Sequence, residues 1–129
     1  MEIRKVLIVD EDADIRAVAQ MGLEDSVDWA VCHASSGFEA LSIAARERPD
    51  VILLDVMMPG MDGITTLRHL REHPATATLP VIFVTAKVQV HEIDHYLDLD
   101  AIGCIAKPFD PLTLAREIRR LVDSARGTA

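Results

Sequence analysis

The chain has 129 residues, of which 50% are hydrophobic and 26% charged, and its formal net charge is −8 at pH 7. These values fit one globular domain and argue against direct binding of nucleic acid, because phosphate backbones require a basic protein face. No apolar run approaches the roughly 20 residues that a membrane helix needs, and the N-terminal stretch lacks the apolar part of a secretory signal. We therefore expect a cytoplasmic protein that does not contact the membrane.

Five short apolar segments are predicted to be β-strands. In chain order they are Val6–Val9, Trp29–His33, Val51–Leu54, Val81–Val84 and Ile102–Ala106. The first, third and fourth segments are continuous and rich in β-branched residues, which is typical of strands buried on both faces of a sheet. The mixed pattern of the second segment predicts a strand at the edge of the sheet.

Helical patterns lie between and after these strands. They cover Asp14–Glu24, Phe38–Glu47, Ile64–Arg71, His91–Leu97 and Leu112–Val122. Alternating strands and helices imply right-handed crossovers and a parallel sheet with helices on both faces. We therefore predict one α/β domain over residues 1–129, doubly wound and flavodoxin-like (βα)5, with strand order 2-1-3-4-5. The tail from Ser124 onward is either a natural end or part of a linker to an output domain.

Polar residues stand at the carboxyl ends of four predicted strands. Asp10 and Glu11 follow the first strand, Asp55 follows the third, Thr85 follows the fourth and Lys107 follows the fifth. In the predicted topology these four ends meet at one edge of the sheet. Three neighbouring carboxylates need a counter-ion, and oxygen ligands suit a hard cation such as Mg²⁺. Four such coincidences argue against a set of unrelated polar strand ends.

Four segments around these residues form a specific combination. They are residues 6–12 (VLIVDED), 55–63 (DVMMPGMDG), 84–86 (VTA) and 106–109 (AKPF). Together they resemble the bacterial response-regulator receiver family over nearly the whole chain. The resemblance implies a two-component signalling switch that receives a phosphoryl group from a histidine kinase or a phosphotransfer protein. It further implies a downstream protein or a fused output domain as the second partner, and no enzyme activity beyond phosphorylation and dephosphorylation of the receiver itself.

The resemblance also implies a divalent cation, Mg²⁺ or Mn²⁺, and its ligands. Glu11 and Asp55 would bind it through their side chains, Asp10 through a water molecule, and Met57 through its backbone carbonyl. The family more often has Asp at the position of Glu11. Glutamate has one more methylene group, and it still provides a carboxylate ligand.

The remaining roles concern the phosphoryl group. Asp55 would be the nucleophile and phosphoacceptor, Lys107 would pair with Asp55 and then with the phosphate, and the Thr85 hydroxyl would bind a phosphate oxygen. The demands are positioning and neutralisation of charge, as in other phosphoryl transfers. The glycines of the loop after Asp55 are free to adopt positive φ angles, which such a turn can use.

The signal output is expected to depart from the common family scheme. An inward-turning aromatic residue often lies three residues before the lysine, and Cys104 stands there in this chain. A cysteine is too small to fill the same space. We therefore expect the surface of the fourth helix, fifth strand and fifth helix to change through the loop after Thr85, including Lys87. The affected surface would comprise residues 91–97 and the start of the last helix at residues 110–112.

Other motifs suggest different functions. His91–His95 matches the H-E-x-x-H zinc protease pattern, but its fourth residue is a charged aspartate and the chain is short for a protease. Residues 10–14 begin like a calcium loop, yet Ile15 and Met21 replace the required glycine and glutamate. The same stretch resembles haloacid-dehalogenase-type phosphatases, with Asp10 as nucleophile, and this is the alternative enzyme hypothesis. A binding module that is never phosphorylated is the non-catalytic alternative.

Three geometric expectations follow from the fold and the resemblance. The Lys107–Pro108 peptide bond should be cis, since the family's loop must turn the lysine toward Asp55, and an X-Pro bond permits this at small cost. Cys32 and Cys104 should lie on opposite edge strands, too far apart for a disulfide bond. Asp100, where the family often has glycine, should keep the turn because aspartate tolerates the left-handed conformation.

Overall fold

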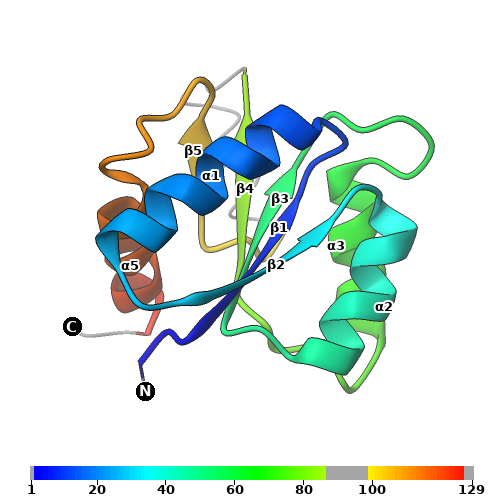
Figure 1. Cartoon of the computed structure of the whole chain (residues 1–129). Helices are drawn as coiled ribbons and strands as arrows, with labels where there is room; N and C mark the ends of the chain where they lie inside the picture. Colours follow the sequence, from blue (N-terminus) through cyan, green and yellow to red (C-terminus); the bar gives the residue numbers. More distant parts are fainter. Residues whose placement is uncertain (1, 87–98, 127–129) are drawn as a thin grey trace.

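The structure is a computed structural model and describes residues 2–86 and 99–126. A five-stranded parallel sheet forms its centre, with helices on both faces (Figure 1). The strands are β1 (Lys5–Val9), β2 (Ala30–Ala34), β3 (Val51–Asp55), β4 (Val81–Thr85) and β5 (Gly103–Ala106). The helices are α1 (Ala13–Ser26), α2 (Gly37–Glu47), α3 (Gly63–Glu72) and α5 (Leu114–Ala125). The strand order is β2-β1-β3-β4-β5, which confirms the predicted topology.

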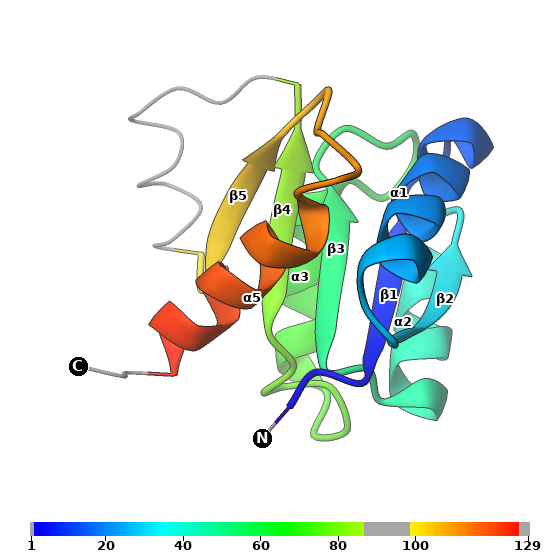
Figure 2. The same ribbon diagram turned by 60° about the vertical axis from the view of Figure 1, so that its left-hand side comes forward.

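Each face of the sheet packs on its own pair of helices. Residues of α2 and α3 join one hydrophobic cluster with alternate residues of the strands, such as Leu7 and Phe83. Residues of α1 and α5 join the other cluster with the intervening strand residues, such as Val6 and Ile82. Figures 1 and 2 show these two helix pairs on opposite sides of the sheet. The period of two along a strand therefore divides the core into two layers.

The inner strands are fully buried, as their continuous apolar sequences predict. Every residue of β3 and β4 is buried, whereas β2 is mostly half-buried or exposed at the sheet edge. The cysteines lie on the two edge strands, Cys32 on β2 and Cys104 on β5, and neither forms a disulfide bond. The expectation of no disulfide bond between them is therefore confirmed.

Three of the helices begin at a residue whose side chain caps the first turn. Asp12 accepts a hydrogen bond from the Asp14 amide, and Asp62 accepts one from the Thr65 amide. Ser36 caps α2 in the same way. These caps satisfy amide groups that the first helical turn leaves without partners, which fixes where each helix starts.

The helix and strand limits differ from the predicted ones by at most three residues, the largest difference being at the end of the last helix, which extends to Ala125 rather than to Val122. The last helix begins at Leu114 rather than at Leu112, because the Asp110 carboxylate accepts a hydrogen bond from the Leu112 amide and forms a turn there. The predicted helix His91–Leu97, with its H-E-x-x-H motif and the preceding Lys87, lies outside the described residues. No helix in the described ranges is long and apolar enough to cross a membrane.

Two backbone expectations are confirmed near the fifth strand. The Lys107–Pro108 peptide bond is cis. Asp100 has a φ angle of 73°, so it adopts the left-handed conformation that the turn before β5 requires.

Candidate functional site

The carboxyl ends of β1, β3, β4 and β5 lie at one edge of the sheet. In the strand register Asp55 is opposite Val84, and Thr85 is opposite Ala106, the residue before Lys107. The Asp10 amide donates a hydrogen bond to the Ala34 carbonyl, 3.1 Å away, so Asp10 directly continues the edge of β1. The sheet therefore brings the residues after these strands to one place, as the sequence predicts.

Lys107 joins the two buried carboxylates of the site. Its Nζ atom lies 2.7 Å from Asp10 Oδ2 and 3.3 Å from Asp55 Oδ1. The side chains of both aspartates are 5% exposed, and that of Lys107 is 16% exposed. The ammonium group donates a hydrogen bond to Asp10, which is the nearer of its two partners.

Backbone amides orient the same carboxylates. Asp10 Oδ1 accepts a hydrogen bond of 2.9 Å from the Asp12 amide, and Asp55 Oδ1 accepts one of 3.3 Å from the Met57 amide. Each amide lies two residues beyond its aspartate, which is the local geometry of an Asx turn. The turns after β1 and β3 therefore hold both carboxylates toward Lys107.

The electrostatics of the site reflect two acids that share one base. Burial raises the pKa of Asp55, and the negative charge of Asp10 raises it further, while Lys107 acts in the opposite direction. Burial lowers the pKa of Lys107, but the hydrogen bond and the charge of Asp10 outweigh this, so the pKa of Lys107 is raised overall. The ammonium group is therefore charged at neutral pH and offsets one of two neighbouring negative charges.

The structure brings together only part of the predicted metal ligand set. Asp10 and Asp55 face the same ammonium group, whereas Glu11 is exposed and Met57 is 70% exposed. Among residues 2–86 and 99–126, no three His, Cys, Asp or Glu side chains are grouped as a metal site. The residues nevertheless fit a hard cation, because their donors are oxygen atoms and one negative charge is left unbalanced. Glu11 and the Met57 carbonyl remain predicted ligands.

The loop after Asp55 uses its two glycines for different reasons. Gly60 has a φ angle of 77°, as expected for this turn. Gly63 does not share this positive φ. Instead, a Cβ atom at Gly63 would lie 2.3 Å from the Asp55 carbonyl oxygen. Gly63 is thus required by the close approach of α3 to the end of β3.

Thr85 is 2% exposed and is the last residue of β4. The Lys107 amide donates a hydrogen bond of 2.9 Å to the Thr85 carbonyl, so the two residues adjoin each other through the backbone. Its predicted bond to a phosphate oxygen remains a prediction.

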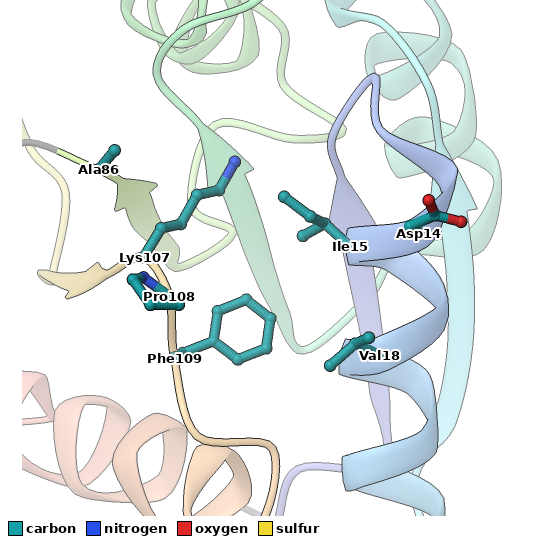
Figure 3. Close-up of a pocket in the computed structure, with 7 residues that line it drawn as sticks. All are labelled: Asp14, Ile15, Val18, Ala86, Lys107, Pro108 and Phe109. Carbon is teal, nitrogen blue, oxygen red and sulfur yellow. The ribbon is translucent and has the colours of Figure 1, made fainter.

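Two features of the site were not predicted from the sequence. Arg16, on α1, donates a hydrogen bond from its guanidinium group to the backbone carbonyl of Asp10. The other feature is a cavity of about 370 Å³ that adjoins Lys107. Figure 3 shows side chains of α1 on one side of this cavity and those of the segment after β5 on the other. Its lining residues are Asp14, Ile15, Val18, Ala86, Lys107, Pro108 and Phe109.

The fold and the acidic edge with its lysine define a signalling receiver domain. A family model described as response regulator receiver domain matches residues 6–119, and the chain belongs to this family. It is thus a receiver domain of the kind found in two-component response regulators, which confirms the resemblance noted in the sequence.

Individual relatives agree with this assignment. The chain is 39% identical over 119 residues to the response regulator PleD of Caulobacter vibrioides, covering 91% of this chain and 26% of PleD. It is 36% identical over 125 residues to the transcriptional regulatory protein ResD of Bacillus subtilis, covering 97% of this chain and 50% of ResD. The chain thus spans half or less of the length of these two relatives.

Solved structures show the same fold. The chemotaxis protein CheY4 of Vibrio cholerae matches with a TM-score of 0.84 and 32% identity, over 93% of this chain and 99% of that chain. A response regulator of Chloroflexus aurantiacus, described as putative, matches with a TM-score of 0.83 and 31% identity, over 95% and 99% of the two chains. Here the match extends over almost all of both molecules.

Proposed function

We propose that the chain accepts a phosphoryl group on Asp55 from a phosphohistidine donor, in a reaction that depends on Mg²⁺. The observation that carries this proposal is the position of Lys107 Nζ, 3.3 Å from Asp55 Oδ1 and 2.7 Å from Asp10 Oδ2. This arrangement joins a buried acceptor carboxylate, a second acid and a fixed positive charge at one open end of the sheet. Phosphoryl transfer needs these elements, because it depends on positioning and on neutralisation of negative charge.

The two oxygens of Asp55 have different surroundings. Within the described residues, the Met57 amide and the Lys107 ammonium both approach Oδ1. We assign Oδ2 as the nucleophile: it forms the new O–P bond, while the P–N bond to the donor imidazole breaks and the imidazole keeps the electron pair of that bond. Lys107 would then balance the charge of the phosphoryl oxygens.

A bound Mg²⁺ ion would supply further charge neutralisation at the phosphoryl oxygens. Asp10, Glu11, Asp55 and the Met57 carbonyl are its proposed ligands. Support comes from the raised pKa of Asp55, which results from burial and from the charge of Asp10. A cation beside both aspartates favours the ionised form of Asp55, and only that form is nucleophilic.

The proposed signal leaves through Thr85. Phosphate on Asp55 adds charge and acceptor oxygens, which would draw the Thr85 hydroxyl and the following loop inward. Cys104 lies opposite Phe83 in the register of β4 and β5 and packs at the edge of the α2–α3 core cluster. The output surface would include the segment of residues 91–97, which lies outside the described residues, and the start of the last helix. Its partner would be a downstream protein or an output domain of the same polypeptide, since ResD is a transcriptional regulatory protein.

The alternative phosphatase hypothesis makes Asp10 the nucleophile. Both carboxylate oxygens of Asp10 already have donors, the Asp12 amide and Lys107 Nζ. A carboxylate engaged in this way is a poorer nucleophile than Asp55. We therefore favour a signalling receiver that catalyses only its own phosphorylation and dephosphorylation.

Incubation with acetyl phosphate and Mg²⁺ tests the proposed function. One phosphoryl group per chain should be detected by intact mass, and Asp55→Asn should abolish the gain. Asp28→Asn is the matched control, because Asp28 is exposed and precedes β2 at the opposite edge of the sheet. Labelling that persists in Asp55→Asn and is lost in Asp10→Asn would instead support the phosphatase hypothesis.

A further inference from the structure

Asp10 is bonded through all four of its polar atoms. Its amide donates to Ala34, its Oδ1 accepts from the Asp12 amide, its Oδ2 accepts from Lys107, and its carbonyl accepts from Arg16. The residue is 3% exposed. A buried carbonyl at the end of a strand needs a partner, because an unpaired one costs free energy. Arg16 provides that partner from the first turns of α1.

The Asp10 carbonyl belongs to the peptide group that joins Asp10 to Glu11. A bond to this oxygen fixes the plane of the peptide and so the direction in which the backbone leaves toward Glu11. Glu11 is exposed, and glutamate has an additional rotatable bond compared with aspartate. To act as a cation ligand beside Asp10 and Asp55, its carboxylate would therefore need a backbone that is fixed in direction.

Arg16 lies on the face of α1 that is linked to β2 by a side-chain hydrogen bond. Gln20 and Glu24 follow it at intervals of four residues, and the side-chain amide of Gln20 donates a hydrogen bond to Glu24 Oε1. The side-chain oxygen Oε1 of Gln20 is hydrogen-bonded to His33 Nε2 on β2. Burial lowers the pKa of His33, and the nearby charge of Arg16 lowers it further, while Glu24 opposes this. The guanidinium group is thus bonded to the end of β1 and lies near enough to His33 for its charge to affect the imidazole.

We propose that Arg16 is a positioning residue for the divalent cation site, because it holds the peptide that carries Glu11. The proposal rests on the proposed function of Asp55 as a Mg²⁺-dependent phosphoacceptor. Arg16 would not touch the cation or the phosphoryl group. It acts through the peptide group that joins Asp10 to Glu11, two residues of the proposed ligand set.

The charge and the hydrogen bond of Arg16 have opposite effects on cation binding. The positive charge repels Mg²⁺, so its removal alone would tighten Mg²⁺ binding. The hydrogen bond holds the ligand backbone in place, so its loss would weaken Mg²⁺ binding. The sign of the change therefore separates a positioning role from a purely electrostatic one.

Titration of the unphosphorylated chain with MgCl₂, followed by amide chemical shifts, measures this sign. Arg16→Met should weaken Mg²⁺ binding by about tenfold, the usual scale for loss of a group that supports metal ligands. Arg16→Lys keeps a charged donor and should recover most of the affinity. Arg46→Met is the matched control, because Arg46 is near the end of α2 beside Glu47, which pairs with Lys5 at the opposite end of β1. It should leave the affinity unchanged.

The imidazole of His33 reports on the site independently of Mg²⁺. In the metal-free protein, Arg16→Met should raise the pKa of His33 measured from its ring proton shifts, because a nearby positive charge is gone. Arg16→Lys should leave the pKa of His33 lowered, because the positive charge is kept. The dispersed amide spectrum of the same sample shows whether α1 stays folded. If Arg16→Met does not fold, Arg16→Gln replaces it, since its shorter neutral side chain also loses the bond to Asp10.

Unchanged or tighter Mg²⁺ binding in a folded Arg16→Met or Arg16→Gln chain would overturn the proposal. A lysine variant as weak as the methionine variant would also overturn it, because helix packing rather than the donated bond would then set the affinity. Failure of the wild-type chain to bind Mg²⁺ at all would refute the proposed function itself, and with it the role of Arg16. The two failures are thus distinguished by the wild-type titration.

Discussion

Lys107 Nζ lies 2.7 Å from Asp10 Oδ2, which is closer than its 3.3 Å approach to Asp55 Oδ1. The lysine thus stabilises mainly the acid at the end of β1 and leaves the carboxylate of Asp55 less well compensated. Burial and the charge of Asp10 accordingly raise the pKa of Asp55. This imbalance leads to different predictions for the two aspartates and for the lysine.

Asp55→Asn should stabilise the unphosphorylated protein at pH 7. Because the pKa of Asp55 is raised in the folded state, the stability linked to this group is fully present below its unfolded pKa. It is lost as the pH rises through the folded pKa, so ionised Asp55 destabilises the fold at neutral pH. The amide should increase the free energy of unfolding by about 1 kcal/mol. The midpoint of thermal unfolding should then rise by about 3–6 °C.

Thermal unfolding in metal-free buffer at several pH values measures this effect. The difference between Asp55→Asn and wild type should shrink below pH 4, where the wild-type carboxyl group is protonated as well. Asp10→Asn should stabilise the protein less than Asp55→Asn does, since it weakens the closer of the two interactions that Lys107 makes. A difference that is constant from pH 3 to pH 7 would contradict the prediction.

Lys107→Met should destabilise the protein at pH 7 by about 2–4 kcal/mol, because two buried carboxylates lose their shared counter-charge. The pKa of Lys107 is raised, so the stability that it adds is present below its unfolded pKa and lost as the pH rises through the folded pKa. The lysine is thus charged at both pH 4 and pH 7. The cost should nevertheless be smaller at pH 4, where protonation removes part of the acidic charge. Urea unfolding at both pH values would test this, and equal costs would count against it.

Gly22→Ala should destabilise the contact between α1 and the segment that leads into α5. A Cβ atom at Gly22 would lie 2.3 Å from the Pro111 carbonyl oxygen, and this neighbour is backbone that cannot rotate away. We expect a cost of about 1–3 kcal/mol from the forced backbone shift. Gly60→Ala is the informative comparison, since its Cβ would meet nothing within 4 Å and only the positive φ of 77° is unfavourable.

Replacement by asparagine instead of alanine should therefore affect stability differently at the two glycine positions. Gly60→Ala should cost about 1–2 kcal/mol, the strain of a left-handed alanine. Gly60→Asn should recover part of this cost, because asparagine tolerates the left-handed region. Gly22→Asn should not improve on Gly22→Ala. Chemical unfolding of the four variants measures each value, and recovery by asparagine at position 22 would disprove the steric explanation.

Arg71→Lys should weaken the connection between α3 and the turn before β5. The Arg71 guanidinium donates to the Asp100 carboxylate at 2.8 Å, to the Asp100 carbonyl at 3.2 Å and to the Leu79 carbonyl at 2.9 Å. A lysine presents one ammonium group and cannot serve all three acceptors in this planar arrangement. We expect a loss of about 1–2 kcal/mol, as for other partly buried bonds to a charged donor. Arg68→Lys, at an exposed position of the same helix, is the control.

Amide hydrogen exchange would locate this effect. Protection should fall at the Leu79 amide, which donates to the Thr76 carbonyl in the loop before β4, and at the Ile102 amide, which donates to the Val81 carbonyl at the start of β4. Loss of protection spread evenly over the sheet would instead indicate a general loss of stability.

Much of the fold was predictable from the sequence alone. The continuous apolar runs of β1, β3 and β4 identify strands buried on both faces, and their alternation with helical patterns favours the doubly wound order that is common for five strands. The same order predicts that Asp10, Asp55 and Lys107 meet at one edge. These inferences succeed because strand ends occupy an edge regardless of the details of side-chain packing.

The sequence by itself thus determined the topology, the receiver family and the edge at which the acids and the lysine gather. Only the tertiary structure decided which acid Lys107 bonds most closely, and that Arg16 bonds the Asp10 carbonyl. It also decided that Gly22 and Gly63 are needed for close backbone approach. The physical reason is one of length scale: hydrophobic periodicity acts over whole strands and helices. The choice of hydrogen-bond partner, in contrast, depends on differences of less than 1 Å between residues as far apart in the chain as Asp10 and Lys107.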